Sequence, residues 1–75
     1  MKITYDPEVD ALYIEFRSAA DGTVRNQPIS DDVTLDYGPD GGLVGIEILD
    51  ARAVLGEEVG HITVEVATPA LAAGR

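Results

Sequence analysis

Residues 43–49, LVGIEIL, decide the fold, because they form the most apolar run of the chain. Val44, Ile46 and Ile48 recur at every second position of this run. A period of two predicts a β-strand that turns one row of side chains toward a core. A strand this apolar is expected at the centre of a sheet.

Turn residues divide the remaining chain about every 8–12 residues, a spacing typical of β-rich domains. Alternating polar and apolar residues predict further strands at residues 2–5, 11–17, 23–27, 33–37 and 62–66. The third of these is polar and is expected near a sheet edge. Asp21-Gly22 predicts the hairpin turn before it, and residues 38–42, GPDGG, predict the turn before the apolar run.

One short helix is predicted over residues 51–55, between the apolar run and the last strand. The Asp50 carboxylate is expected to cap its first amides, and Gly56 to end it. Val54 and Leu55 are expected to pack on the sheet edge.

The pattern as a whole predicts an α+β, mostly β fold, with an antiparallel, meander-like sheet of five to six short strands and one short helix before the last strand. Residues 1–68 are expected to form this single domain, and residues 69–75 a frayed C-terminal tail.

Composition limits the possible partners, because 14 Asp and Glu against 5 Lys and Arg give a net charge of −9. Such a chain is not expected to bind nucleic acid directly or an anionic membrane surface. The absence of cysteine and the single histidine exclude disulfides, thiolate zinc sites and histidine clusters. No signal peptide or transmembrane run is recognised, so the cytoplasm is the expected compartment.

Size favours self-association, because a domain of 75 residues buries only about 60% of the surface of its unfolded chain. Small domains gain stability from disulfides, metals or oligomerisation. With the first two disfavoured by composition, a homodimer is the simplest expectation.

The candidate functional surface consists of Tyr13, Glu15, Asp36 and Glu47, which alternation turns away from the apolar face together with Glu65. Several carboxylates on one surface can hold a divalent cation. They are also the ordinary solvated face of an antiparallel sheet, and this interpretation is favoured. No catalytic, metal-binding or cofactor-binding residue is assigned.

Asp6, Glu8 and Asp10 are spaced like the start of a calcium loop. The loop also needs Gly at its sixth position and Glu at its twelfth. Ala11 and Arg17 occupy those positions, so the match fails. Asx turns explain the two aspartates better.

Three stretches match the signature of one family: YD at 5–6 with DALYI at 10–14, LD at 35–36 with DG at 40–41, and LVGIEILDA at 43–51. The chain therefore resembles the bacterial and archaeal domain-of-unknown-function 2283 family over roughly residues 1–66. The resemblance implies no assigned activity. Some members are said to lie beside small toxin-like genes, which implies an antitoxin-like role.

The leading functional hypothesis is a small protein-interaction module, a homodimer that binds a basic protein partner through its acidic surface or a sheet edge. Two alternatives remain open: a divalent-cation or ligand-binding protein that uses the outward carboxylates, and a purely structural, self-assembling domain. No cofactor is expected. His61 has no nucleophile positioned beside it by any recognised motif, so no enzymatic activity is expected either.

Overall fold

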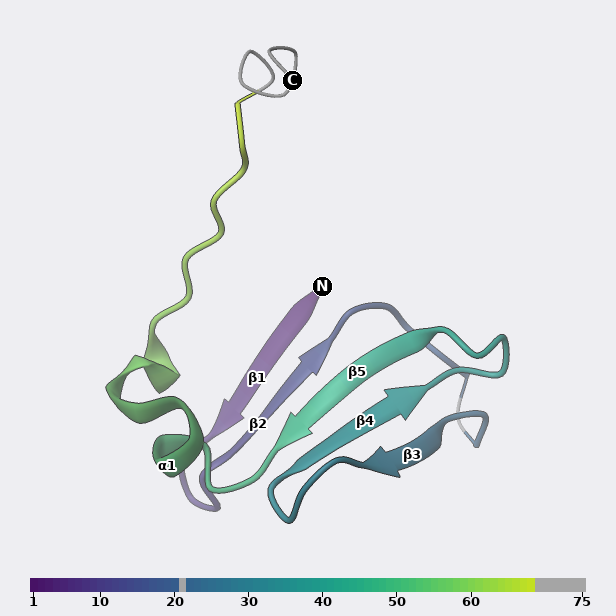
Figure 1. Ribbon diagram of the computed structural model, residues 1–75, viewed down its shortest axis with the longest axis horizontal. Helices are drawn as coiled ribbons and strands as arrows, with labels where there is room; N and C mark the ends of the chain where they lie inside the picture. Colours follow the sequence, from purple (N-terminus) through teal and green to yellow (C-terminus); the bar gives the residue numbers. More distant parts are fainter. Residues whose placement is uncertain (21, 69–75) are drawn as a thin grey trace.

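One open antiparallel sheet makes up most of the protein, as Figure 1 shows. The computed structural model describes residues 1–20 and 22–68. Its elements are β1 (Lys2–Asp6), β2 (Ala11–Glu15), β3 (Arg25–Pro28), β4 (Val33–Tyr37), β5 (Leu43–Ile48), the helix α1 (Ala51–Leu55) and the 3₁₀ helix η1 (Gly56–Gly60). The strand order is β1-β2-β5-β4-β3. The predicted α+β, mostly β class is therefore confirmed.

The apolar run forms the central strand, as predicted. β5 lies between β2 and β4, and Ile46 stands opposite Ile14 on one side and Leu35 on the other. Apolar residues of three neighbouring strands thus reach the same face, which fixes the register of all three strands.

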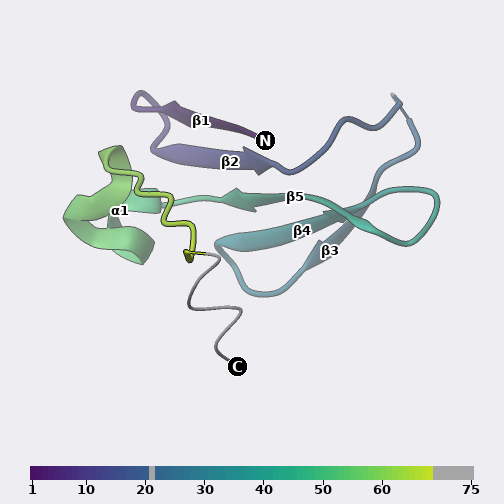
Figure 2. The same cartoon turned by 90° about the horizontal axis from the view of Figure 1, so that it is seen from above.

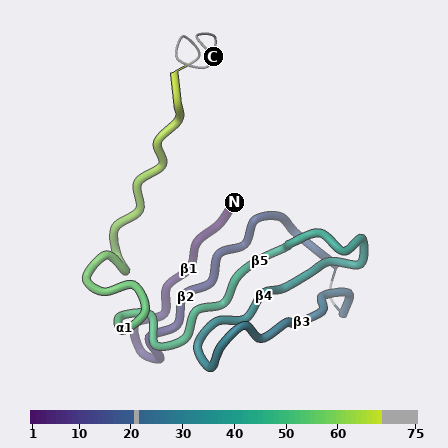
Figure 3. The backbone as a smooth tube through the Cα atoms, viewed as in Figure 1, coloured from purple at the N-terminus to yellow at the C-terminus, as the bar shows by residue number. Residues whose placement is uncertain are grey.

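The expected hairpin between the second and third strands is wrong. β2 pairs with β5 instead, and the chain crosses to the far edge of the sheet, where β3 pairs with β4 (Figure 3). A turn does form here, since the Thr23 amide donates to the Ala20 carbonyl and Gly22 has a φ of 77°. Asp21 lies outside the described residues. A glycine sets the local turn, but the apolar side chains of β5 select the neighbour of β2.

Residues 61–68, called the C-terminal arm below, differ from the predicted sixth strand. The arm has no strand partner in the described structure and runs from η1 away from the sheet (Figure 1). Ile62, Val64 and Val66 are 60%, 80% and 82% exposed. The alternation is present, but a strand also needs a neighbour for its backbone groups. The frayed tail predicted at residues 69–75 lies outside the described residues.

The two faces of the sheet have opposite chemistry. The apolar face is defined by Ile3, Tyr5, Leu12, Ile14, Arg25, Gln27, Val33, Leu35, Tyr37, Ile46 and Ile48. The polar face is defined by Lys2, Thr4, Asp6, Ala11, Tyr13, Glu15, Asn26, Pro28, Thr34, Asp36, Gly45 and Glu47. Among these strand residues, all within the described chain, every carboxylate lies on the polar face.

The helix has the predicted bounds and ends at Gly56, whose φ is 68°. It packs differently from the prediction, because Ala51 is fully buried whereas Val54 and Leu55 are 43% and 37% exposed. Ala51 joins a small core with Leu12 and Ile48. Figure 2 shows that α1 lies at one end of the sheet, so it covers only part of the apolar face. In the described chain, no helix is long and apolar enough to cross a membrane.

Asp10, and not Asp50, caps this helix. Asp50 has a φ of 52° and makes no capping hydrogen bond through its side chain. The Asp10 carboxylate accepts the Arg52 amide at 3.2 and 3.3 Å and the Tyr5 hydroxyl at 2.7 Å. Its carbonyl accepts the Ala51 amide at 3.0 Å. The turn between β1 and β2 therefore holds the first turn of α1. Asp6 makes the predicted Asx turn with the Glu8 amide.

The cap can be tested with two matched glycine substitutions, because Asp10 and Asp50 have nearly the same positive φ, 53° and 52°. Glycine accepts this backbone conformation at either site. Asp10→Gly should lower the free energy of unfolding by about 1–2 kcal/mol, since the Arg52 amide and the Tyr5 hydroxyl both lose their charged acceptor. Asp50→Gly should change it by less than about 0.5 kcal/mol. Urea denaturation measures both, and equal losses would contradict this assignment.

Candidate functional site

The four residues of the predicted surface lie on three adjacent strands of the polar face. Tyr13 of β2 stands opposite Glu47 of β5, and Gly45 has Glu15 on one side and Asp36 of β4 on the other. Glu65, predicted on the same face, lies on the C-terminal arm and is exposed. The sheet thus brings together four of the five residues.

Tyr13 passes over Gly45 to reach Asp36. Its hydroxyl donates to Oδ2 of Asp36 at 2.8 Å, across the width of β5. A Cβ atom at Gly45 would lie 2.6 Å from Cζ of Tyr13 and 2.7 Å from the Ile14 carbonyl oxygen. Only glycine leaves room for the phenol ring, so Gly45 and Tyr13 form one structural unit.

Asp36 is the one buried polar residue of the described chain, at 9% exposure. Its second oxygen, Oδ1, accepts the side-chain amide of Asn26 on β3 at 2.6 Å. Both carboxylate oxygens are therefore hydrogen-bonded, which offsets the free-energy cost of burying the group. We call Tyr13, Asn26, Asp36 and Gly45 the tyrosine bridge, because together they connect β2, β5, β4 and β3.

The hydroxyl of Tyr13 is held in its protonated form. Burial, followed by the hydrogen bond to Asp36, raises its pKa from 10.0 to about 12, and the negative charges of Asp36, Glu15 and Glu47 act in the same direction. At neutral pH the hydroxyl keeps its proton and donates a hydrogen bond to the Asp36 carboxylate.

The carboxylates of the polar face do not converge on a cation position. The described residues contain no group of three or more potential metal-ligating side chains. Both oxygens of Asp36 are already hydrogen-bonded. Glu47 lies two residues beyond Gly45 on β5 and is exposed. Of the four predicted surface residues only Glu47 is exposed, and Asp36 is buried, which differs from the predicted solvated face.

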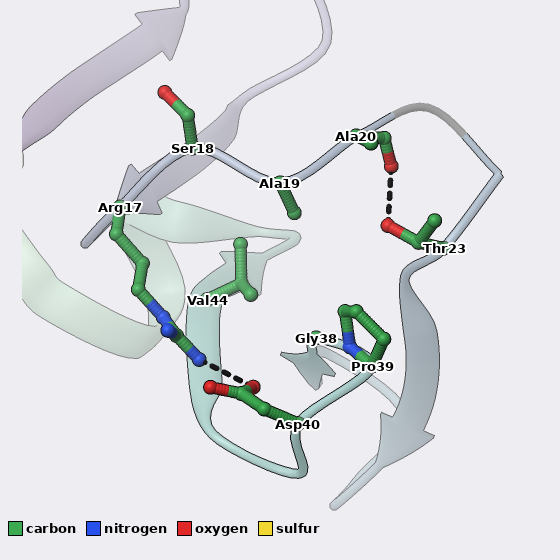
Figure 4. Close-up of a pocket in the computed structure, with 9 residues that line it drawn as sticks. All are labelled: Arg17, Ser18, Ala19, Ala20, Thr23, Gly38, Pro39, Asp40 and Val44. Atoms are coloured by element: carbon green, nitrogen blue, oxygen red, sulfur yellow. Dashed lines mark hydrogen bonds and ion pairs between the residues drawn. The ribbon is translucent and has the colours of Figure 1, made fainter.

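A second feature, absent from the sequence prediction, is a cavity of about 340 Å³ beside the β4–β5 turn (Figure 4). An ion pair lies at the edge of this cavity, where Nη2 of Arg17 is 2.7 Å from Oδ1 of Asp40. Asp40 also accepts the Gly42 amide at 3.0 Å. The Arg17 hydrogen bond, followed by that amide, lowers the pKa of Asp40 to about 2. The pair closes a loop against the end of β2, and no motif predicts it because 23 residues separate its members.

A family model described as "Protein of unknown function (DUF2283)" matches residues 2–52. The chain belongs to this family. The predicted resemblance is thereby confirmed. No curated protein and no solved structure matches it significantly.

The part of the chain that matches the DUF2283 model contains all five strands and the tyrosine bridge. It ends at Arg52, whose amide is bonded to Asp10. The tyrosine bridge and the Asp10 cap therefore both lie within the matched range. The C-terminal arm lies beyond it.

The requirement for glycine in the tyrosine bridge can be tested with Gly45→Ala. The added methyl group meets the Tyr13 ring and the backbone of Ile14, so the free energy of unfolding should fall by about 1–3 kcal/mol. Gly60→Ala is the control, since a Cβ there meets nothing within 4 Å. Chemical denaturation of the two variants gives the comparison, and a Gly45→Ala protein as stable as the control would refute the close contact.

Proposed function

We propose that the protein is a non-catalytic interaction module that forms a homodimer through its apolar face and uses its acidic polar face to hold a basic protein of the cytoplasm, in an antitoxin-like role. The observation that carries this proposal is the incomplete covering of the apolar face. Its support comes from burial, charge and the placement of α1.

Within the residues that the structure describes, a second layer covers one end of the apolar face only. Buried apolar residues in the described chain are Leu12, Val44, Ile48 and Ala51, and none of the larger side chains is fully buried. Ile14, Leu35 and Tyr37 are only half-buried, although they lie on the same face. A sheet with one apolar face needs another layer to exclude water from it. A protein partner on this face would supply that layer.

The charge pattern of the apolar face permits a second copy as that partner. Two chains with a net charge of −9 repel one another unless their contact avoids carboxylates. The strand residues of the apolar face include none, and their one charged group, Arg25, lies over the ring of Tyr37 at 5.0 Å. A twofold dimer would place two such surfaces in contact.

The polar face remains open in such a dimer and suits a basic partner. Its strands carry Asp6, Glu15, Asp36 and Glu47, against the one basic residue Lys2. Complementary charge accelerates association and selects partners.

Retention of a basic protein should fall in a Glu47→Lys variant, and unchanged retention would remove this part of the proposal.

The dimer can be tested with two aspartate substitutions at neighbouring positions of β4. Leu35→Asp places a carboxylate on the apolar face, where burying it unpaired would raise the dimer dissociation constant by about 100-fold or more. Thr34→Asp adds the same charge to the polar face and should leave the constant nearly unchanged. Sedimentation equilibrium measures both. A native chain that stays monomeric at millimolar concentration would contradict the proposal.

A further inference from the structure

The C-terminal arm has the pattern of a strand but no neighbour in the described structure. Ile62, Val64 and Val66 alternate with Thr63 and Glu65. The start of the arm lines an apolar groove of about 330 Å³ together with Ile3, Ile14 and Leu55. The rest of the arm extends away from the sheet, as Figures 1 and 3 show. An extended apolar segment with unpaired backbone groups is a ligand for an exposed sheet edge.

The sheet has two free edges, and only β1 is suited to receive a strand. β3, at one edge, is four residues long and contains Pro28, which has no amide hydrogen to donate. β1, at the other edge, is five residues long and contains no proline. Its one long basic side chain, Lys2, offers little protection against an acidic strand.

One antiparallel register between the arm and β1 matches both chemistry and face. It places Glu65 opposite Lys2 and His61 opposite Asp6 on the polar face. It also places Val64 opposite Ile3, which extends the apolar face by one strand. The opposite charges of Glu65 and Lys2 and the apolar pair of Val64 and Ile3, each directly across the two strands, would stabilise this pairing. A shift by one residue would place the valine on the polar side.

We infer that the C-terminal arm of one copy adds to β1 of a second copy as the sixth strand of that copy's sheet, in the register with Glu65 opposite Lys2. The inference rests on the proposed homodimer and names the segment that joins its subunits. Each copy gives one arm and receives one, so the exchange is closed and twofold. The arm beyond the groove already extends away from its own sheet, and Val64 and Val66 remain exposed until a second copy binds them.

The experiment uses the full chain, which contains no cysteine to interfere. Thr4→Cys and Thr63→Cys chains, one of them labelled with ¹⁵N, are mixed and oxidised, since the register places these two exposed residues opposite each other. The yield of labelled chain joined to unlabelled chain through these two cysteines should be about tenfold or more above the yield of a control mixture. The control mixes Thr34→Cys with Thr63→Cys chains, because β4 lies inside the sheet.

A second pair guards against poor disulfide geometry, because the two kinds of antiparallel pair alternate along a strand and differ in spacing. Ile3→Cys mixed with Val64→Cys tests the other kind. The inference is overturned if neither pair gives more crosslinked product than the Thr34→Cys with Thr63→Cys control. It is also overturned if a Thr4→Cys, Thr63→Cys double variant, oxidised at a concentration at which the native chain is dimeric, closes within single chains, since the arm then pairs with its own β1.

These outcomes separate the arm from the dimer itself. A native dimer that Leu35→Asp dissociates, but that gives no crosslink between arm and β1, overturns the exchange and leaves the proposed function standing. A chain that is monomeric at millimolar concentration overturns both.

Discussion

The rest of the structure depends on the hydrogen bond that Tyr13 makes to Asp36 across Gly45. It connects β2 to β4 over the central strand, and Asn26 extends the connection to β3. Because Asp36 is buried, a shift of register would leave its carboxylate without donors, which is costly. The bridge therefore holds the strands in the one alignment that places their apolar residues on the opposite face.

That alignment divides the sheet into two surfaces with different uses. The polar face satisfies its buried carboxylate internally and presents Glu15 and Glu47 outward. Among the described residues, α1, η1 and the start of the C-terminal arm lie against the apolar face, and a capping bond from Asp10 holds α1 at one end of the sheet. The half-buried remainder of the apolar face and the exposed arm are surfaces that the described part of one chain leaves uncovered. In the proposed dimer, a second chain covers them.

Sequence patterns predicted the features that neighbouring residues determine. They did not predict contacts between residues far apart in the chain. Alternation gave the five strands and the central place of β5, and Gly56 gave the end of α1. The cap from Asp10 was missed because 42 residues separate it from Arg52. Alternation also placed Tyr13 and Asp36 on one face, but it could not show that glycine at position 45 lets them meet.

The most direct test of the tyrosine bridge is the titration of Tyr13, followed by NMR of ring-labelled tyrosine and assigned with Tyr13→Phe. Its pKa should be about 12 in the folded protein, above the ordinary value of 10.0. The hydroxyl should therefore stabilise the fold below pH 10, and this stabilisation should be lost as the pH rises toward 12. Tyr13→Phe should accordingly be less stable than the native chain at pH 8 and lose that difference near pH 12. A Tyr13 that titrates near 10, with no pH-dependent difference between the two proteins, would contradict the account.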